Sequence, residues 1–312
     1  MSASEYIDSL VRKLGDAGYV ADRDIVVPLY LSLKLKKPLL LEGDPGCGKT
    51  ELAKALSSVF GVELIRLQCY EGLDASSAIY EWNYQKQMIA IRLAERKKST
   101  AKQVEKQIFS QEFLLPRPLL STVLACNLAP KKKGHDELVP PAILLIDEVD
   151  RADEEFEGLL LEFLGEFQVT VPEIGTFRAK ASPLVIITSN RTRDLGDGLR
   201  RRCIYSYVSY PTKEREMEIV SKKVPTSSNR LQTEVVSFVE DVRNENQIFK
   251  KPGISETIDW ANAIISLGVD QIGEKKILNN DLVGETISVL LKDPEDLKKF
   301  NSEKIHRVLS KL

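Results

Sequence analysis

One short stretch limits the fold more than any other feature of this sequence. Residues 43–50 read GDPGCGKT and match the pattern G-x-x-x-x-G-K-[ST]. The apolar residues 39–41 precede the stretch, and an amphipathic pattern follows from Lys49 to about Phe60. Glycines let the backbone wrap a phosphate, so that successive N–H groups and the start of the helix point at it. The sequence therefore predicts a phosphate-binding loop between a buried strand and a helix, with a chance glycine-rich turn as the alternative.

The loop also carries the side chains that nucleotide binding requires. Lys49 supplies a positive charge for the β- and γ-phosphates, and Thr50 supplies a hydroxyl ligand for Mg²⁺. We therefore predict ATP and Mg²⁺ as cofactors. The predicted nucleotide-binding residues are Gly43, Asp44, Pro45, Gly46, Cys47, Gly48, Lys49, Thr50 and Glu51.

A second apolar run ends in acidic residues. The stretch AILLIDEVD, residues 142–150, delivers Asp147 and Glu148 at the carboxyl end of a predicted strand, where α/β sheets place their chemistry. Asp147 is predicted to hold Mg²⁺ through water, while Glu148 polarises the water that attacks the γ-phosphate. The alternative is a helix N-terminus with acidic first-turn residues, which suits Asp150 and Asp153 better.

Two further segments extend the predicted site. The run PLVIITSN ends in Asn190, whose neutral amide can contact both the γ-phosphate and the attacking water, although a plain turn residue explains it equally well. Arg200, Arg201 and Arg202 then precede the last apolar run, and three adjacent arginines cannot all be satisfied inside one compact domain. They are predicted to reach the phosphate of a neighbouring subunit, with a solvated basic turn as the alternative.

The distribution of apolar runs predicts the fold class. Five short apolar runs alternate with helical patterns up to residue 210, which favours an α/β domain whose parallel strands are buried on both faces. Residues 211–312 show only helical patterns and predict a second, all-helical domain. The cysteines Cys47, Cys69, Cys126 and Cys203 lie far apart, so buried free thiols are expected rather than a disulfide framework or a metal site.

Charge and hydropathy limit the function classes. Lysine and arginine number 44 against 46 acidic residues, so a net charge of −2 gives no overall attraction to nucleic acid or to an anionic membrane. No uncharged apolar stretch is long enough to span a bilayer, and the N-terminus has charges where a signal peptide needs an apolar centre. The expected location is therefore the cytoplasm.

Taken in order, these motifs resemble those of the AAA+ ATPases, and within them the MoxR family. By this resemblance GDPGCGKT is Walker A, LLIDEVD is Walker B, and Asn190 is sensor 1. Arg202 of LRRRC is then the arginine finger, with Arg200 and Arg201 beside it and Arg151 of DEVDRAD as a second candidate. The resemblance implies an AAA+ P-loop core, residues 1–210, with a five-stranded parallel sheet between helices, followed by a small helical lid at residues 211–312.

The same resemblance covers two insertions and one departure. Residues 65–98 lie where the family carries its helix-2 insert, and residues 167–183 look like the hairpin before sensor 1. Trp82 and Tyr84 in the insert fit either a client-contacting tip or a small satellite core. Many MoxR relatives start a lid helix with Gly-Ala-Ser-Pro-Arg, where this chain has GISETIDWA and therefore no sensor 2 arginine.

Three segments are similar in sequence to the CoxD-like branch: LIRLQCYEGLD, YEWNY and DEVDRADEEFEGLLLEFL. That branch is associated with maturation of carbon monoxide dehydrogenase-type molybdenum enzymes and works with a von Willebrand factor A domain protein. The expected function is thus a Mg²⁺-dependent ATPase that forms a ring of six subunits and remodels a protein client.

Two alternatives to the protein remodeller stay open. The first is a remodeller of nucleic acid, which the near-zero net charge disfavours. The second is a slow, nucleotide-gated scaffold, which the missing lid arginine favours. The basic stretch at residues 131–135 is read as a solvated loop without a role.

Overall fold

The computed structural model describes residues 2–96, 100–129, 138–268 and 277–312. The basic stretch at residues 131–135 lies outside the described residues. Contacts divide the chain into two compact units. The first contains Met1–Ile7, Arg23–Glu42 and Thr50–Tyr207, and the second contains Asp8–Asp22, Gly43–Lys49 and Val208–Leu312. Within the described ranges, every helix is too short or too polar to cross a membrane.

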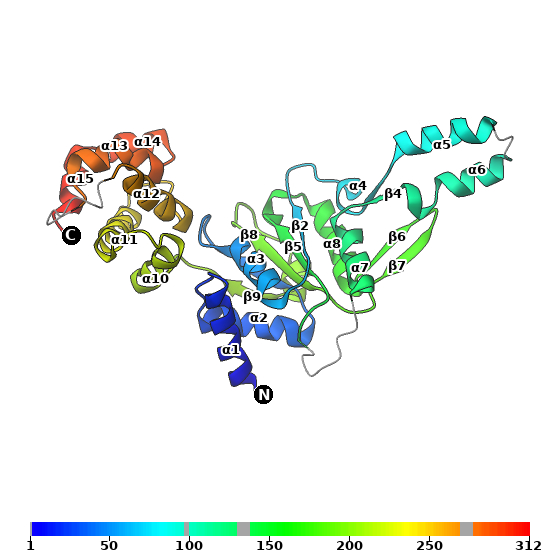
Figure 1. Ribbon diagram of the computed structural model, residues 1–312, viewed down its shortest axis with the longest axis horizontal. Helices are drawn as coiled ribbons and strands as arrows, with labels where there is room; N and C mark the ends of the chain where they lie inside the picture. The colour runs from blue at the N-terminus through cyan, green and yellow to red at the C-terminus, as the bar shows by residue number, and fades with distance from the viewer. Residues whose placement is uncertain (1, 97–99, 130–137, 269–276) are drawn as a thin grey trace. The chain divides into compact units, whose positions relative to one another are not determined.

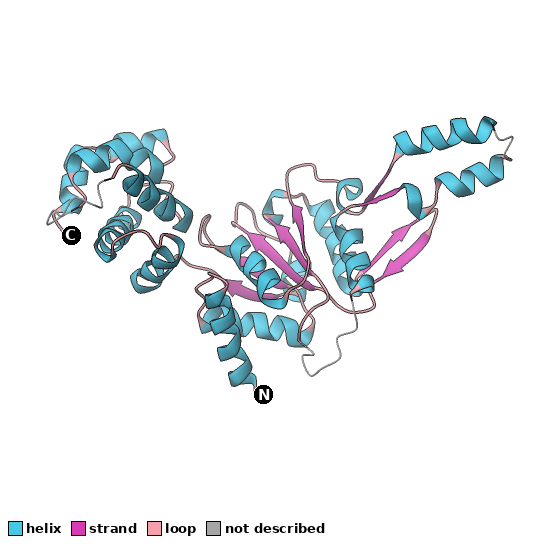
Figure 2. Cartoon of the chain, viewed as in Figure 1, coloured by secondary structure: helices cyan, strands magenta, loops and turns pink. Residues whose placement is uncertain are grey.

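The first unit is built on a five-stranded parallel sheet (Figures 1 and 2). The strand order is β2-β5-β8-β1-β9, and because the strands are parallel, each connection between them must cross a face of the sheet. All five predicted apolar runs form strands, and the predicted fold class is confirmed. The strands are β1 (Leu39–Glu42), β2 (Leu64–Gln68), β5 (Ile143–Asp147), β8 (Leu184–Ser189) and β9 (Ile204–Tyr207).

Burial differs between the centre and the edges of this sheet. Every residue of β1, β5 and β8 is buried, as the continuous apolar runs predict. The edge strands β2 and β9 instead alternate, and Arg66 and Tyr205 are exposed. The prediction that all strands are buried on both faces is therefore wrong for the edge strands, where alternate side chains point to a face of the sheet that is open to solvent.

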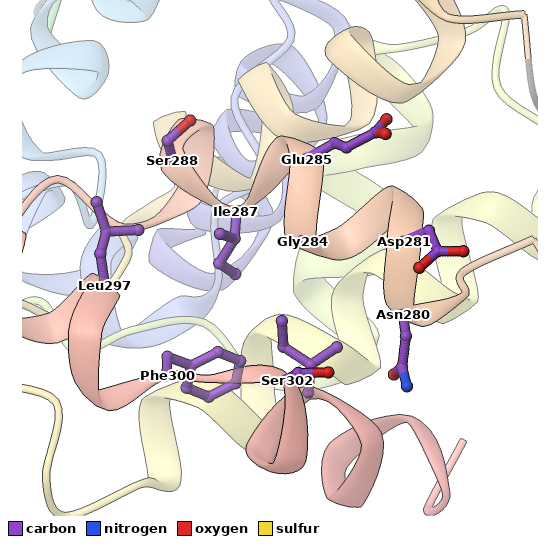
Figure 3. A pocket seen from close by; sticks show the side chains of 10 residues that line it. Asn280, Asp281, Gly284, Glu285, Ile287, Ser288, Leu297, Phe300 and Ser302 are labelled. Carbon is purple, nitrogen blue, oxygen red and sulfur yellow. The ribbon is translucent and has the colours of Figure 1, made fainter.

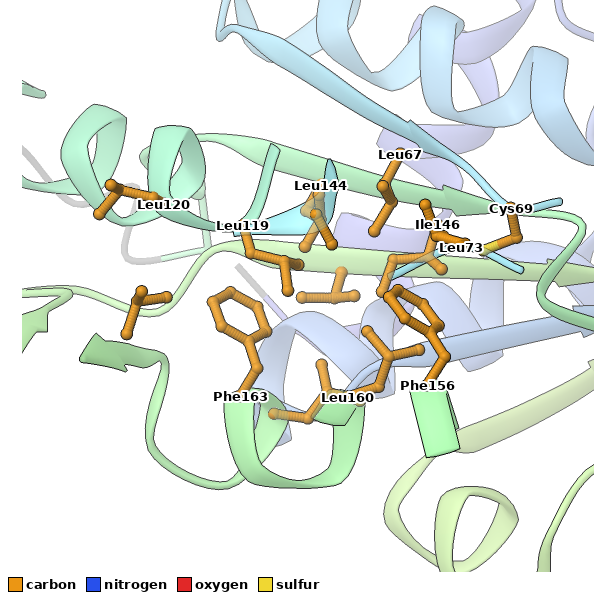
Figure 4. Close-up of a cluster of buried hydrophobic side chains, with 14 of the residues drawn as sticks. Leu67, Cys69, Leu73, Leu119, Leu120, Leu144, Ile146, Phe156, Leu160 and Phe163 are labelled. Carbon is orange, nitrogen blue, oxygen red and sulfur yellow. The ribbon is translucent and has the colours of Figure 1, made fainter. Parts of the chain in front are cut away.

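Helices cover the sheet of the first unit and form its core. Figure 4 shows Phe156, Leu160 and Phe163 of α8 pointing toward Leu144 and Ile146 of β5. Burying each such side chain contributes about 1.5–3 kcal/mol. The main helices here are α2 (Arg23–Leu35), α3 (Lys49–Phe60), α7 (Pro118–Leu128), α8 (Glu154–Glu166) and α9 (Asp197–Arg202), while α1 (Ala3–Asp16) contributes residues to both units.

A helical excursion interrupts the core after β2. Strand β3 (Tyr80–Trp82) pairs antiparallel with β4 (Leu114–Pro116), and this pairing closes the excursion. Between them lie α5 (Tyr84–Arg96), α6 (Ala101–Ile108) and a 3-10 turn at Gln111–Phe113; the short α4 (Ala75–Ala78) precedes β3. The expected insert at 65–98 is thus corrected to 80–116, because the alternating residues of β2 belong to the sheet and the return strand lies far along the chain.

The two aromatic residues of the excursion have different surroundings. Trp82 is buried, with its ring centroid 5.3 Å from that of Phe109 and 6.1 Å from that of Tyr80. Tyr84 is 64% exposed. The satellite-core alternative therefore applies to Trp82, while Tyr84 remains on the surface.

A second small sheet follows α8. Strands β6 (Gln168–Val171) and β7 (Gly175–Arg178) pair antiparallel, with Val169 opposite Phe177. This hairpin lies within residues 167–183 and leads into β8, the strand that ends before Asn190.

The second unit contains the helical C-terminal region. Its core includes Phe238, Trp260 and Phe300, with ring centroids 5.0 Å apart for the first pair and 5.9 Å for Phe238 and Phe300. The helices are α10 (Lys213–Lys223), α11 (Asn229–Asn244), α12 (Ile254–Ser266), α13 (Asn280–Leu290), α14 (Pro294–Lys299) and α15 (Ser302–Leu309). A buried aromatic cluster in an all-helical region confirms that these residues fold as packed helices.

Candidate functional site

The predicted phosphate loop connects β1 to α3. Gly43 follows the last residue of β1, and its φ of 158° lies outside the range that other residues readily adopt. A Cβ at Gly43 would lie 2.0 Å from the carbonyl oxygen of Val208, so the space is closed to any side chain. Gly46 has a φ of 78°. The glycines of the motif are therefore required by the backbone path itself.

Lys49 is directed at the loop that it follows. Its side chain is buried, and Nζ donates to the carbonyl oxygens of Gly43 at 2.7 Å and Asp44 at 2.8 Å. The thiol of Cys47 donates to the same Asp44 carbonyl at 2.9 Å. Burial raises the pKa of Cys47, and the nearby Lys49 ammonium offsets only part of this effect, so the thiol stays neutral. The loop thus holds one positive charge at its centre.

Thr50 and Asp147, the two predicted metal ligands, are in direct contact. Thr50 Oγ1 donates to Asp147 Oδ1 at 2.9 Å, and Thr188 Oγ1 of β8 donates to the same oxygen at 2.6 Å. Asp147 is only 3% exposed. A hydroxyl and a carboxylate are the oxygen donors that Mg²⁺ prefers, so these residues fit that ion. Thr188 was not predicted, because a threonine in a buried strand has no signal of its own.

Arg66 of β2 is a second unpredicted partner of Asp147. Its Nη2 and Nε lie 2.6 and 3.1 Å from Asp147 Oδ2. The side chain is 51% exposed, although the carboxylate that it contacts is buried. An arginine within an otherwise apolar strand was the available signal, but the contact depends on the register that places Gln68 beside Asp147.

Glu148 has an unusual backbone conformation. Its φ of 56° and ψ of 50° are left-handed, which costs free energy in a residue other than glycine and is typical of functional sites. The backbone N–H donates to Thr188 Oγ1 at 2.9 Å. Asn190 Nδ2 donates to Glu148 Oε1 at 3.3 Å, so the fold brings these two predicted catalytic residues together.

The other carboxylate oxygen of Glu148 has two partners. Gln68 Nε2 donates to Oε2 at 3.1 Å, and Arg151 Nε lies 2.9 Å from the same atom. Arg151, proposed from the sequence for contact across a subunit boundary, is thus paired within its own chain. Both partners are more than half exposed or at the sheet edge, so water can replace them at little cost.

Asp150 fixes the loop that carries Asn190. Its carboxylate is buried and accepts hydrogen bonds from the Asn190 N–H at 3.1 Å, the Thr192 N–H at 2.9 Å and Thr192 Oγ1 at 2.7 Å. Burial raises the pKa of Asp150, but these hydrogen bonds outweigh burial and the net pKa is lowered. The helix-start interpretation holds for both acidic residues: Asp153 is the N-cap of α8 and accepts from the Phe156 N–H, and Asp150 lies in the first turn of a 3-10 helix at Val149–Arg151.

The three adjacent arginines have three different environments. Arg200 donates to Glu42 Oε1 at 2.9 Å, and this carboxylate at the end of β1 is 1% exposed. Arg202 donates to the carbonyl oxygen of Leu161. The Arg201 side chain is 82% exposed and its guanidinium lies 3.4 Å from the exposed Asp197. Arg200 is thus committed within its own chain, whereas Arg201 is the least constrained.

The other three cysteines are unreactive thiols. Burial raises the pKa of Cys69, Cys126 and Cys203 to about 12, so their thiols are neutral. All four cysteines are free, and Cys203 is partly exposed rather than buried. In the part of the chain that the structure describes, no group of three or more His, Cys, Asp or Glu side chains could hold a metal ion.

A cleft of about 650 Å³ lies among α13, α14 and α15 (Figure 3). Asp281 and Glu285 line one side, and Leu297 and Phe300 contribute apolar surface. The Asn280 Oδ1 atom is buried without a hydrogen-bond partner. None of the sequence-predicted site residues lines this cleft.

Comparison with known proteins gives distant relatives over most of the chain. An uncharacterized protein of Staphylococcus epidermidis, SERP0979, is 26% identical over 254 residues, covering 79% of this chain and 82% of that protein. A 48-residue segment is 40% identical to Midasin of Giardia intestinalis, but the match covers 15% of this chain and 1% of Midasin. The activity of so long a protein cannot be transferred from so short a match.

Among solved structures, the Holliday junction branch migration motor RuvB of Thermotoga maritima is similar over 96% of this chain and 75% of its own. Its sequence identity is 16% and its TM-score 0.45, values at which the likeness carries no functional argument. The decisive match is to a family model. Residues 38–203, more than half of the 312 residues, match the AAA domain of the dynein-related subfamily, and they contain the loop, both acidic residues, Asn190 and the arginines. The chain therefore belongs to this AAA domain family and is an AAA+ ATPase with a P-loop nucleotide-binding fold.

Proposed function

We propose that this AAA+ ATPase hydrolyses ATP in a Mg²⁺-dependent reaction and uses the energy to remodel a protein client. The observation that carries the proposal is that Thr50 is hydrogen-bonded to Asp147 and Asn190 to Glu148, so that these four residues meet at one edge of the sheet. They are placed by one helix and the ends of two strands, α3, β5 and β8, which lie far apart in the sequence. Such an arrangement of hydroxyl, carboxylate and amide groups supports phosphoryl transfer to water.

Thr50 and Asp147 would hold Mg²⁺, Thr50 by its hydroxyl and Asp147 through water. When bound, Mg²⁺ would neutralise charge on the β- and γ-phosphate oxygens. Lys49 adds its own positive charge to the same phosphates. To do so, its ammonium must exchange its contacts with the Gly43 and Asp44 carbonyls for phosphate oxygens.

Glu148 is proposed to orient the attacking water and to take its proton, with Asn190 fixing the position of that water. Their hydrogen bond supports a shared role because both side chains then face one small volume. Asp150 holds the Asn190 backbone and is a positioning residue for it. Gln68 and Arg151 occupy the second carboxylate oxygen of Glu148 and must yield it to water before reaction.

We further propose assembly into a ring of six subunits in which an arginine completes the neighbouring site. The sequence interpretation preferred Arg202, whereas the side-chain environments favour Arg201, which is the more exposed and the less constrained. An exposed guanidinium that has only a surface ion pair can move to a phosphate at little cost.

We propose from the sequences of its motifs that the chain is a MoxR protein of the CoxD-like branch. The similarity of DEVDRADEEFEGLLLEFL and YEWNY to MoxR proteins of the CoxD-like branch supports a role in metalloenzyme maturation. The same resemblance supports a von Willebrand factor A domain protein as a partner. The exposed Tyr84 on the excursion is then available for contact with a client.

The substitution Glu148→Gln tests the proposed hydrolysis. It keeps the shape of the side chain but removes the base, so we expect ATP binding to persist while turnover falls by about 10²–10⁴-fold. Glu162→Gln, which changes an exposed glutamate of α8, is the matched control and should hydrolyse normally. Undiminished turnover in Glu148→Gln would refute the assignment.

The same assay tests assembly when it is run across protein concentration. Turnover per subunit should rise with assembly in the wild type and collapse in Arg201→Ala, while Arg202→Ala retains more activity. A turnover that is flat with concentration and indifferent to both arginines would favour a protein that signals by nucleotide-gated docking.

A further inference from the structure

The phosphate loop is in backbone contact with the first turn of α12. The N–H of Ile254 donates to the carbonyl oxygen of Gly46 at 2.9 Å. A Cβ added to Gly253 would lie 2.7 Å from Gly46 Cα and 3.0 Å from the Gly46 carbonyl oxygen. Real Cβ atoms do not approach backbone this closely, so the contact excludes every side chain at position 253.

The backbone conformation of Gly253 does not itself require glycine. Its φ of −85° and ψ of −176° are extended values that any residue adopts. Gly46 differs, because its φ of 78° favours glycine independently of its neighbours. The glycine at 253 is therefore explained by close packing, chiefly against the backbone of the phosphate loop and also against the Glu256 carboxylate, whose Oε2 would lie 2.9 Å from an added Cβ.

A buried ion pair holds this turn in place. Arg243 of α11 donates from Nε to the carbonyl oxygen of Pro252 at 2.7 Å and from Nη2 to Glu216 Oε1 of α10 at 2.9 Å. Thr257 Oγ1 lies 3.1 Å from the Gly253 carbonyl oxygen and 2.7 Å from Glu216 Oε1. Arg243, Glu216 and Thr257 are 7%, 1% and 0% exposed. Residue 252, through Arg243, and residue 253, through Thr257, are thus both linked to the Glu216 carboxylate.

Tyr210 provides a second connection between the ion pair and the loop. The Arg243 guanidinium lies 4.8 Å from the centre of the Tyr210 ring, and the Tyr210 hydroxyl donates to the Pro45 carbonyl oxygen at 3.4 Å. Burial raises the pKa of Tyr210 to about 12, so the phenol keeps the proton that it donates. The loop is therefore contacted at two successive residues, Pro45 and Gly46.

We propose that Arg243 is a positioning residue for nucleotide binding, because it keeps the 252–253 turn in contact with the phosphate loop and so stabilises the conformation of the loop. This inference rests on the proposed role of the loop in binding nucleotide phosphates. A loop held in advance loses less conformational entropy when it binds, so affinity rises without any new contact to the ligand. By linkage, an occupied loop stabilises the turn by the same free energy.

Glu256 lies where the MoxR resemblance leads us to expect a sensor 2 arginine. Glu256 Oε2 accepts a hydrogen bond from the Gly253 N–H at 3.0 Å, so this side chain caps the turn. The first turn of α12 therefore reaches the loop through backbone atoms, in place of a cation directed at the phosphates.

Gly253→Ala tests the contact directly. Alanine fits the local backbone but not the space beside Gly46, so ADP affinity should weaken at least about fivefold. The probe is a fluorescent ADP analogue titrated into the full chain. Gly284→Ala in α13 is the matched control, because a Cβ there meets nothing within 4 Å, and it should bind as the wild type does. Wild-type affinity in Gly253→Ala would overturn the proposal.

Arg243→Lys is the second variant and guards against misfolding as an explanation. Lysine keeps the charge beside Glu216 but cannot bind that carboxylate and the Pro252 carbonyl at once. KM for ATP should rise with little change in kcat, and hydrogen exchange at the Ile254 amide should quicken while exchange in the α13 core stays as in the wild type. Unchanged exchange at Ile254 together with unchanged KM would refute the role of Arg243.

These outcomes separate the inference from the proposed function. A wild-type chain that binds ADP but shows no turnover would remove the hydrolytic proposal, and the inference would still be tested by the ADP affinity of both variants and by hydrogen exchange at Ile254 in Arg243→Lys. A wild-type chain that turns over normally, with both variants indistinguishable from it in ADP affinity, would remove the inference alone.

Discussion

Two arginine–carboxylate pairs with the same chemistry behave differently in the two units. In the first unit, Arg66 contacts Asp147 with an arginine side chain that is 51% exposed and a carboxylate that is 4% exposed. In the second unit, Arg243 contacts Glu216, and both side chains are buried at 8% and 1% exposure. The carboxylates are equally hidden, so the difference lies in the arginines.

That difference determines which pair can be exchanged. An exposed arginine can leave its partner and be hydrated, so Asp147 can give up Arg66 for another cation at little cost. Arg243 cannot leave Glu216 without leaving a buried charge without its partner, which costs several kcal/mol. The pair at the sheet edge is therefore suited to chemistry, and the pair among the helices is suited to holding a backbone turn.

The largest expected effect is on the buried pair. Glu216→Leu leaves Arg243 buried without its carboxylate and should lower the free energy of unfolding by about 3–5 kcal/mol. The double variant Glu216→Leu with Arg243→Met should recover most of this loss, because it removes both charges. Urea denaturation of the wild type, the single variant and the double variant measures these free energies of unfolding. A loss below about 1 kcal/mol in the single variant would show that the pair is no less exchangeable than a surface pair.

Asp150 sharpens the comparison, because it is a buried carboxylate held by hydroxyl and N–H groups rather than by an arginine. Asp150→Asn replaces one acceptor oxygen by an NH₂ group, which would face the N–H and O–H donors of Asn190 and Thr192. The substitution should lower the free energy of unfolding by about 1–3 kcal/mol at neutral pH. Its lowered pKa means that the wild-type stabilisation is present above the unfolded value of about 3.9 and is lost as pH falls through the folded pKa.

The pH series in this comparison uses thermal unfolding between neutral and acid pH. The difference between wild type and Asp150→Asn should shrink as the wild-type carboxylate takes up its proton. A difference that stays constant across this range would show that the charge of Asp150 does not contribute.

The smallest expected effect on stability is at Arg66. Arg66→Gln removes a half-exposed partner of Asp147 and should change the free energy of unfolding by no more than about 1 kcal/mol. The Mg²⁺ concentration for half-maximal hydrolysis should fall, because the ion no longer competes with a guanidinium. If the Mg²⁺ concentration for half-maximal hydrolysis rises instead, Arg66 positions Asp147. The Arg66–Asp147 pair would then have a structural role, as the Arg243–Glu216 pair does.

Much of the candidate site could be predicted, because its signals are local. The spacing GDPGCGKT placed Lys49 and Thr50 at the start of α3, and the apolar run before Asp147 placed both carboxylates at a strand end. Thr188 and Arg66 were missed because their contacts depend on which strands are neighbours and in which register. The order β2-β5-β8 aligns residues that are about forty and eighty positions from Asp147 in sequence.

The sequence by itself determined the element types, the strand ends and the residue chemistry of the phosphate loop and acidic edge, because backbone sterics and hydrophobic periodicity act over a few residues. Only the tertiary structure decided which arginine is held and which is exposed, that Asp150 fixes the Asn190 loop, and that the excursion closes at Pro116. It alone also revealed that Gly46 and Glu256 leave no room for a side chain at Gly253. These outcomes depend on burial and close approach between distant segments, and no short stretch of sequence carries that information.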